Sequence, residues 1–391
     1  MKNDELQTLE TDAGFPLGSK WAISTPPTTQ FIVPGVTIKE ESEVLQKISD
    51  ALLSSIKGQK IELEGTNWAV RAQCEQLPVP FMCCNDISNP NTLIFETILH
   101  PADPLGHHAD IINILFHCFP ELQGISDAGC NSWYSQEDLK KELKKNLPPN
   151  PDFLFCIESI VEKNKNETNR IRTIGLERAS RPEINIHEVP EAYTDEMASI
   201  LAEIAALSLE VPISEPGEKY SLAENIFGLI EINKNIEIDT SKHDQVHIKD
   251  IDGTSWPHSL LTAVQKKKSG VWRSKALSKR IQYAAQNSWN LLLRTAENKH
   301  INILIAVPWT DASEQKKTEH IWFEVKSVTE NKLLASPIHA PAIASIPNEN
   351  QFFQKSDISD WRINTPIGLL GPFDTDALNE FLLLSGIKPL S

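Results

Sequence analysis

The stretch Glu319-His320-Ile321-Trp322-Phe323-Glu324-Val325 decides the fold of the last third of this 391-residue chain. Aromatic and β-branched residues dominate it, so we expect a strand over Ile321–Val328. Two further runs predict partner strands, Ile301–Trp309 before it and Leu333–His339 after it. The segment closes on Asp357-Ile358-Ser359-Asp360-Trp361. These patterns predict a compact, strand-rich module at about 300–365.

Two aromatic side chains are the expected structural anchors of this module. Trp322 and Trp361 are large enough to bury about 200 Å² each in a small core. A long helix over about Ser274–Ala296 is predicted to precede the module. A terminal helix, Asp374–Leu384, is predicted to follow it, capped by Asp374 and stopped by Gly386.

The remainder of the chain alternates between helical and extended patterns. Amphipathic spacing predicts helices at Glu40–Lys57, His107–Phe119, Ser135–Asn146 and Asp195–Leu209. Apolar runs predict strands at Gln30–Thr37, Lys60–Gln76, Val79–Cys84, Asn91–His100, Phe153–Val161, Arg170–Arg178, Pro182–Val189 and Ile226–Ile232. Strands and helices mix without strict β-α-β alternation, so we expect an α+β fold with two mixed sheet-and-helix domains.

Proline and glycine mark the expected domain boundaries. Residues 1–29 carry no periodicity and are predicted to form an extended lead-in. The segment 211–217, Val-Pro-Ile-Ser-Glu-Pro-Gly, is the clearest break and is the predicted linker. We therefore expect an N-terminal domain at 30–210 and a C-terminal domain at 218–391, the latter containing the strand-rich module.

The charge balance limits the classes of partner. The net charge is −16, from 53 acidic and 37 basic residues, and such a surface as a whole repels nucleic acid and anionic lipid. The N-terminus lacks the apolar core of a secretory signal, and no window has the 18 uncharged apolar residues of a membrane span. We expect a soluble cytoplasmic protein without a membrane partner, whose six cysteines stay reduced.

One basic stretch departs from this acidic background. No Asp or Glu occurs from Thr254 to Ala296, and aromatic residues alternate with the bases there. Bases interleaved with aromatic rings can grip phosphates and stack bases. The stretch 266–280 is therefore a candidate anion-binding or nucleic-acid-binding site, formed by Lys267, Arg273, Lys275, Lys279 and Arg280, although docking of this basic face on the acidic remainder, or its simple solvation, is the favoured interpretation. Contact with a protein partner is the remaining alternative.

Histidines and acids in one polar loop raise the question of a metal ion. His243 and His247 are four residues apart, the spacing of metal ligands on a helix, but the sequence around them favours a loop entering a strand. The run Asp250-Ile251-Asp252-Gly253 resembles the start of a calcium loop and lacks its later ligands. We therefore predict no metal ion and no cofactor.

Two other polar groups are expected to be structural. The arginines Arg170, Arg172, Arg178 and Arg181 are close enough to bind an anion, although ion pairs with Glu177 or Glu183 are the favoured outcome. His107 and His108 stand at a helix start, where neutral imidazoles serve as caps. No Gly-rich phosphate loop, nucleophile elbow or H-E-x-x-H motif occurs.

The C-terminal segment resembles a known family. Its Trp-bearing strand, the strand Leu333-Leu334-Ala335-Ser336-Pro337-Ile338 and the ending Ser359-Asp360-Trp361 are similar to the YegJ-type bacterial domain of unknown function. The resemblance covers about 60 residues. It implies a bacterial cytoplasmic origin within a larger uncharacterised family, and it brings no catalytic residues with it.

The sequence favours a non-enzymatic binding or adaptor protein, of which an immunity-type protein is one form. Its acidic surface suits a basic protein as partner. An enzyme whose residues converge in a groove between the two domains is the alternative, together with the anion or nucleic-acid binder described above. The ligand, the oligomeric state and the pathway are not encoded in these patterns.

Overall fold

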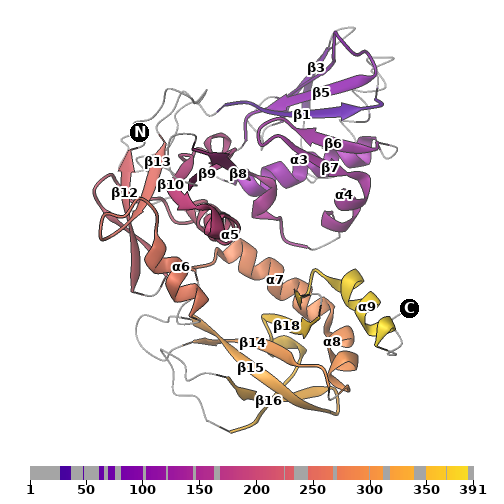
Figure 1. Ribbon diagram of the computed structural model, residues 1–391. Coiled ribbons are helices and arrows are strands. Elements are labelled where there is room, and N and C mark those ends of the chain that lie inside the picture. The colour runs from indigo at the N-terminus through magenta and orange to yellow at the C-terminus, as the bar shows by residue number, and fades with distance from the viewer. Residues whose placement is uncertain are drawn as a thin grey trace. The chain divides into compact units, whose positions relative to one another are not determined.

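The computed structural model describes residues 27–36, 47, 61–65, 69–74, 81–99, 103–119, 122–143, 147–162, 168–223, 225–232, 245–266, 271–298, 300–310, 318–338, 349–366 and 368–385. The fold is α+β, as predicted, with three mostly antiparallel sheets among these residues (Figure 1). The chain divides into two compact units. The first comprises Met1–Lys145 and Pro149–Ala276, and the second comprises Asn146–Pro148 and Leu277–Ser391.

The first sheet of unit 1 has the strand order β2-β3-β4-β5-β1-β6-β7, and every neighbouring pair is antiparallel. Its strands are β1 (Thr29–Pro34), β2 (Ile61–Gly65), β3 (Ala69–Cys74), β4 (Phe81–Asn85), β5 (Thr92–Thr97), β6 (Gly124–Asp127) and β7 (Ser132–Ser135). Phe31, Val33 and Phe95 alternate with less buried neighbours and supply the core face of the central strands.

Two helices accompany this sheet. Helix α3 (Pro104–Cys118) begins at Asp103, whose carboxylate accepts a hydrogen bond from the Gly106 N–H. Helix α4 (Gln136–Glu142) is capped by Ser135 as the sequence predicted, and Asp138 completes a capping box. His107 and His108 lie buried in the first turns of α3 rather than at its cap, because Asp103 already fills that position.

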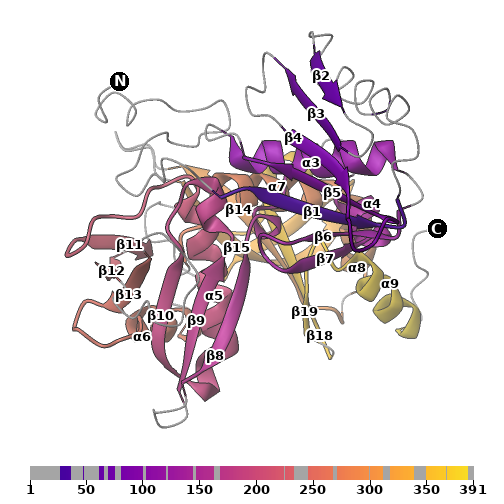
Figure 2. The ribbon, with the colours of Figure 1, turned by 90° about the horizontal axis from the view of Figure 1, so that it is seen from above.

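The second sheet of unit 1 has the order β11-β12-β13-β10-β9-β8. Its strands are β8 (Cys156–Val161), β9 (Thr168–Ile174), β10 (Ile184–Pro190), β11 (Lys219–Ala223), β12 (Ile226–Ile232) and β13 (Val246–Asp250). Strands β10 and β13 pair in parallel, and the other neighbours are antiparallel. Helix α5 (Thr194–Ser208) packs against β8, β9 and β10 (Figure 2), and α6 (His258–Gln265) follows β13.

Helix α5 buries its predicted stripe of apolar residues in the core. Met197, Ile200, Leu201 and Ile204 are all buried, at the helical spacing that the sequence showed. They join residues of both sheets in one continuous hydrophobic cluster, which includes Phe31, Leu154 and Ile186. Unit 1 is therefore held together by one core rather than by two separate ones.

The division into units falls elsewhere than the sequence suggested. The predicted linker 211–217 connects α5 to β11 inside unit 1, because the parallel pairing of β10 with β13 carries the second sheet across it. Glu210, just before that segment, accepts hydrogen bonds from the N–H groups of Lys275 and Ala276 at the start of α7. The boundary between the units lies at Ala276, within this helix.

Unit 2 is built on an antiparallel sheet of order β17-β16-β15-β14-β18-β19. Its strands are β14 (Ile303–Thr310), β15 (Thr318–Thr329), β16 (Lys332–Pro337), β17 (Gln351–Phe353), β18 (Asp360–Thr365) and β19 (Gly368–Leu370). The long helix predicted before this sheet is two helices, α7 (Lys275–Asn287) and α8 (Trp289–Ala296), which are separated at Ser288. The terminal helix is α9 (Thr375–Leu384).

The two predicted tryptophan anchors differ in the structure. Trp361 is fully buried in the core of unit 2, and its indole N–H donates to the Ser288 hydroxyl. Trp322 is only half-buried, because the alternation of β15 points Ile321 and Phe323 into the core and Trp322 to the other face. Phe323, packed edge-to-face on Phe353, holds the position that the sequence assigned to Trp322.

Candidate functional site

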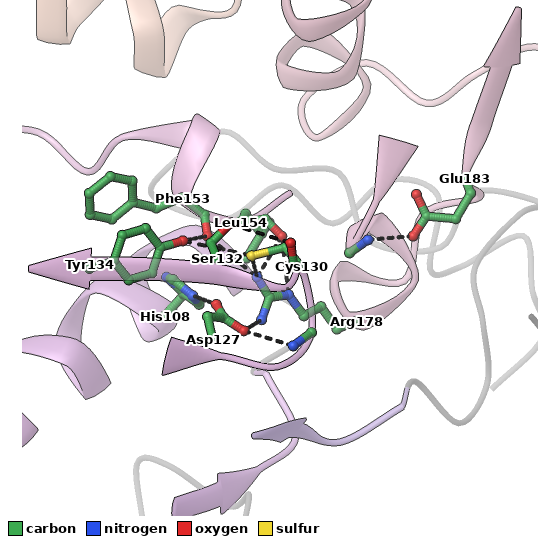
Figure 3. A network of polar contacts seen from close by, with 11 residues as sticks. His108, Asp127, Cys130, Ser132, Tyr134, Phe153, Leu154, Arg178 and Glu183 are labelled. Atoms are coloured by element: carbon green, nitrogen blue, oxygen red, sulfur yellow. Dashed lines mark hydrogen bonds and ion pairs between the residues drawn. The ribbon is translucent and has the colours of Figure 1, made fainter. Parts of the chain in front are cut away.

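A buried ionic network lies in unit 1 and joins segments far apart in sequence (Figure 3). At its centre is Asp127, at the end of β6. One carboxylate oxygen accepts from Arg178 Nη1 at 2.6 Å, and the other is 2.9 Å from His108 Nε2. The Gly129 N–H adds a third hydrogen bond to the same carboxylate. The side chains of Asp127, His108 and Arg178 are at most 2 % exposed, so none of them meets solvent.

The guanidinium of Arg178 connects this pair to the loop before β8. Its Nε and Nη2 donate to the Leu154 carbonyl, and Nη2 also approaches the Phe153 carbonyl and the Cys130 sulfur. The Tyr134 hydroxyl donates to the same Phe153 carbonyl. Arg178 sits in a 3-10 turn, Leu176–Ala179, directly after β9. The network therefore ties the first sheet to the second.

The electrostatics of this network match a structural role. Burial opposes ionisation of Asp127, but the hydrogen bond from His108 and the charge of Arg178 outweigh it and hold the Asp127 pKa far below its usual range. Burial lowers the pKa of His108 and raises that of the Cys130 thiol. The histidine is then neutral and the thiol protonated at neutral pH, so Cys130 is not an activated nucleophile.

A second buried carboxylate, Glu183, lies beside this network. Its oxygens accept from the Thr173 hydroxyl at 2.6 Å and from the Gly175 N–H at 2.7 Å. Complete burial raises the pKa of Glu183 from 4.5 to about 7, although these hydrogen bonds oppose the shift. The carboxyl group fixes the turn between β9 and β10, where Gly175 adopts a positive φ of 114°.

A more accessible group of ligand-type side chains lies where β13 ends. Asp250, Asp252 and His258 offer ligand atoms that all lie within 4.8 Å of one another. Asp250 Oδ2 is 3.1 Å from His258 Nδ1, and Asp252 Oδ2 is 3.7 Å from His258 Nε2. The imidazole thus stands between the two carboxylates. Its side chain is 38 % exposed, whereas that of Asp250 is 2 % exposed.

The loop that carries this group is anchored on both sides. His247 Nε2 donates to the Ser255 carbonyl at 2.8 Å, and the Ser255 hydroxyl donates to Glu188. Burial and the neighbouring His187 lower the pKa of His247 to about 4, so the ring is neutral. Glu188 holds a positive φ of 58° at a bulge in β10, a conformation that persists only under such restraint.

An acidic and aromatic surface adjoins the same loop, and we call it the acidic–aromatic patch. Tyr193 and Trp256 stack with ring centroids 5.9 Å apart, and Trp256 also contacts the His258 ring. Tyr193 is 38 % exposed. The exposed carboxylates of Glu191, Asp195 and Glu196 flank it in the turn before α5 and in the first turn of that helix. The patch is defined as these five residues.

The described part of the structure does not bring the predicted anion-binding residues together in one site. Arg273 is 3.7 Å from Glu203 in an ion pair. Arg280 is buried, donates to the Pro148 carbonyl and lies over the Phe373 ring. Lys275 and Lys279 are exposed on α7, and Lys267 lies outside the described residues. Arg280 is thus a structural residue, and binding of an anion by the stretch 266–280 stays a prediction.

The structure also places the arginines and histidines that the sequence singled out. Three of the four arginines make structural contacts, as favoured: Arg172 pairs with Glu158, Arg178 with Asp127, and Arg181 donates to the Ser208 and Leu209 carbonyls. Arg170 is buried in β9. His247 lies in a strand, as the sequence indicated, and His243 lies outside the described residues. The sequence did not identify His258, six residues beyond Asp252, as the neighbour of both acids.

The chain was compared with protein-family models, with curated proteins and with solved structures, and nothing matches in any of the three comparisons. The resemblance of the segment at about 300–365 to the YegJ-type domain therefore stays a prediction. Among the described residues no helix is both long and apolar enough to cross a membrane.

Proposed function

We propose that this protein is a binding protein that takes a basic segment of another protein on its acidic–aromatic patch. An adaptor or immunity-type role fits this class. The observation that supports it most is the stacked pair of Tyr193 and Trp256 beside exposed carboxylates. Lysine and arginine side chains interact favourably with aromatic faces and with carboxylates together, so such a surface has a defined ligand chemistry.

The charge distribution supports the same location. The residues of unit 1 include 41 acidic and 26 basic side chains, a net charge of −15, whereas those of unit 2 include 12 and 11, a net charge of −1. Nearly all of the acidic excess therefore belongs to the unit that carries the patch. A field of this sign speeds the encounter with a cationic partner and repels nucleic acid.

Not all residues of the acidic–aromatic patch are explained by stabilisation of helix α5. Asp195 and Glu196 lie in the first turn of α5, where carboxylates favour the helix dipole. Glu191 precedes the helix in a separate 3-10 turn, and an exposed tyrosine stacked on tryptophan adds nothing to the dipole. Glu191 and Tyr193 are therefore the residues that separate a binding role from a purely structural one.

The test uses the full chain and a fluorescein-labelled decalysine peptide, with binding followed by fluorescence anisotropy. We expect binding that weakens with added salt. Glu191→Lys should lower the affinity about fivefold or more, since one attraction becomes a repulsion worth about 1 kcal/mol near a protein surface.

Glu380→Lys is the matched control, because Glu380 is an exposed carboxylate on α9 of unit 2. Tyr193→Ser should also weaken binding without a change in net charge. Equal losses in Glu191→Lys and Glu380→Lys, with no loss in Tyr193→Ser, would show that only the overall charge attracts the peptide, and the patch would be rejected as the site.

A further inference from the structure

We propose that Asp250, Asp252 and His258 form a binding site for a divalent transition metal ion such as Zn²⁺. The three residues come from the end of β13, the turn after it and the first residue of α6. They bring two carboxylates and one imidazole together. This inference is independent of the proposed partner binding, because none of the three residues belongs to the acidic–aromatic patch.

One ligand atom from each of the three residues lies within 4.8 Å of the others, and the separation between Asp250 and His258 fits a coordination sphere. Zinc bonds of about 2.0–2.2 Å in tetrahedral geometry place neighbouring ligand atoms roughly 3.3 Å apart. Asp250 Oδ2 and His258 Nδ1 are 3.1 Å apart, and Asp252 Oδ2 and His258 Nε2 are 3.7 Å apart. These two contacts use different nitrogens of the ring, and one ion binds only one of them, so His258 or Asp252 must reorient for all three residues to bind the same ion.

Buried polar atoms without partners give the second, independent reason. Asp250 is 1 % exposed, yet its Oδ1 has no hydrogen-bond partner. His258 Nδ1 is also inaccessible to solvent and makes no hydrogen bond, although Asp250 is close to it. A buried carboxylate oxygen without a partner has lost its hydration and gained nothing in exchange, which is unfavourable. Coordination of a cation removes that cost for both atoms at once.

The backbone holds both carboxylates in place for this role. Asp250 Oδ2 accepts from the Ser259 N–H at 2.7 Å, and Asp252 Oδ1 accepts from the Thr254 N–H at 2.8 Å. Asp252 is thus oriented through Oδ1 and keeps Oδ2 for a ligand. In Asp250 the oxygen nearest His258, Oδ2, also accepts the hydrogen bond, and Oδ1 is the oxygen without a partner. Gly253, with φ of +91°, closes the turn between the acids and the rest of the loop.

The ligand types select the class of metal. Two carboxylates balance the charge of a divalent ion, and an imidazole nitrogen favours Zn²⁺, Fe²⁺ or a similar ion over Ca²⁺ and Mg²⁺, which prefer oxygen ligands. Three protein ligands leave at least one coordination position for water. The solvent-exposed side of Asp252 and His258 gives the ion a route of entry.

The test is isothermal titration of the chelator-treated full chain with Zn²⁺ alone, and separately with Ca²⁺. We expect one Zn²⁺ per chain and weaker binding of Ca²⁺. Asp252→Asn and His258→Gln should each lower the Zn²⁺ affinity at least tenfold, because each removes one of three ligands. Both side chains are partly exposed, so these variants are expected to fold.

Glu380→Gln, which removes an exposed carboxylate outside both the metal-ligand group and the acidic–aromatic patch, is the control and should bind Zn²⁺ like the parent chain. The proposal would be overturned by an absence of stoichiometric Zn²⁺ binding, which would leave His258 as a simple ion-pair partner of two acids. It would also be overturned by Zn²⁺ binding that the Asp252→Asn and His258→Gln variants retain, or by Ca²⁺ binding of equal strength that His258→Gln leaves unchanged.

Discussion

Two regions of unit 1 each place a histidine against an aspartate, and they differ in what surrounds the pair. Around Asp127, both carboxylate oxygens have partners within 2.9 Å, and the side chains of the network are inaccessible. Around Asp250, the imidazole lies between two carboxylates, part of it faces solvent, and a carboxylate oxygen and a ring nitrogen have no hydrogen bond. The residue types are similar, but only the second region has coordination capacity left.

This difference separates structural from ligand-binding chemistry. A buried network whose members satisfy one another is costly to break and offers nothing to a ligand. A partly exposed group whose oriented polar atoms lack hydrogen bonds contributes little to folding, but those atoms can bind an ion. Substitutions around Asp127 should therefore lower the free energy of unfolding, whereas substitutions around Asp250 should lower the affinity for a metal ion.

Asp127→Asn should have the largest effect on stability. The amide cannot neutralise Arg178, which stays buried beside it, and loss of one partner of a buried ion pair costs about 3–5 kcal/mol. Urea denaturation of the full chain, followed by circular dichroism, measures the loss. Asp252→Asn is the matched control, with a change within about 0.5 kcal/mol. Equal losses in the two variants would contradict the contrast.

Glu183→Gln should make stability depend less on pH. The folded-state pKa of Glu183, about 7, lies above its ordinary value of 4.5. The folded chain therefore binds the extra proton between these values, and its stability falls as pH rises through that window. The shift corresponds to about 3 kcal/mol. Glutamine does not titrate, so the parent should lose about that much stability relative to the variant between about pH 4 and pH 8.

Denaturation curves at several pH values give this difference, and the exposed Glu380→Gln corrects for the loss of any one carboxylate. A parent chain and a Glu183→Gln variant with parallel pH profiles would show that Glu183 ionises as readily in the folded state as in the unfolded one.

His108→Leu should have a smaller effect than the Asp127 substitution. It leaves one oxygen of Asp127 without its hydrogen bond but keeps the ion pair with Arg178. A buried acceptor without a partner costs about 1–3 kcal/mol. Chemical denaturation at neutral pH measures this loss. A loss as large as that of Asp127→Asn would place the histidine, rather than the arginine, at the centre of the network.

Local structure was predictable where one face of an element is apolar. The stripe Met197–Leu201–Ile204 and the cap at Ser135 depend on residues within a few positions of one another, so the sequence shows them directly. Trp322 was misplaced because residue size alone does not reveal which face of β15 meets the core. The unit boundary was misplaced because the pairing of Ile184 with Val246 spans a proline-rich segment that locally resembles a linker.

The candidate sites were less predictable than the elements. Asp127 and Arg178 are 51 residues apart, and no local pattern relates them. Asp250 and Asp252 were noticed as a pair, but the third member, His258, belongs to the next helix. Only the turn at Gly253 and the start of α6 bring it back to the acids. Sequence spacing therefore gave the candidates for a site, and tertiary structure selected among them.

The most direct test of the contrast is the urea unfolding free energy with and without Zn²⁺ for three chains: the parent, His108→Leu and Asp252→Asn. We expect His108→Leu to be about 1–3 kcal/mol less stable than the parent and yet to keep the full stabilisation by Zn²⁺. Asp252→Asn should match the parent without metal and lose most of the Zn²⁺ effect. Stabilisation by Zn²⁺ that is equal in the parent and in Asp252→Asn would contradict the contrast between the two regions.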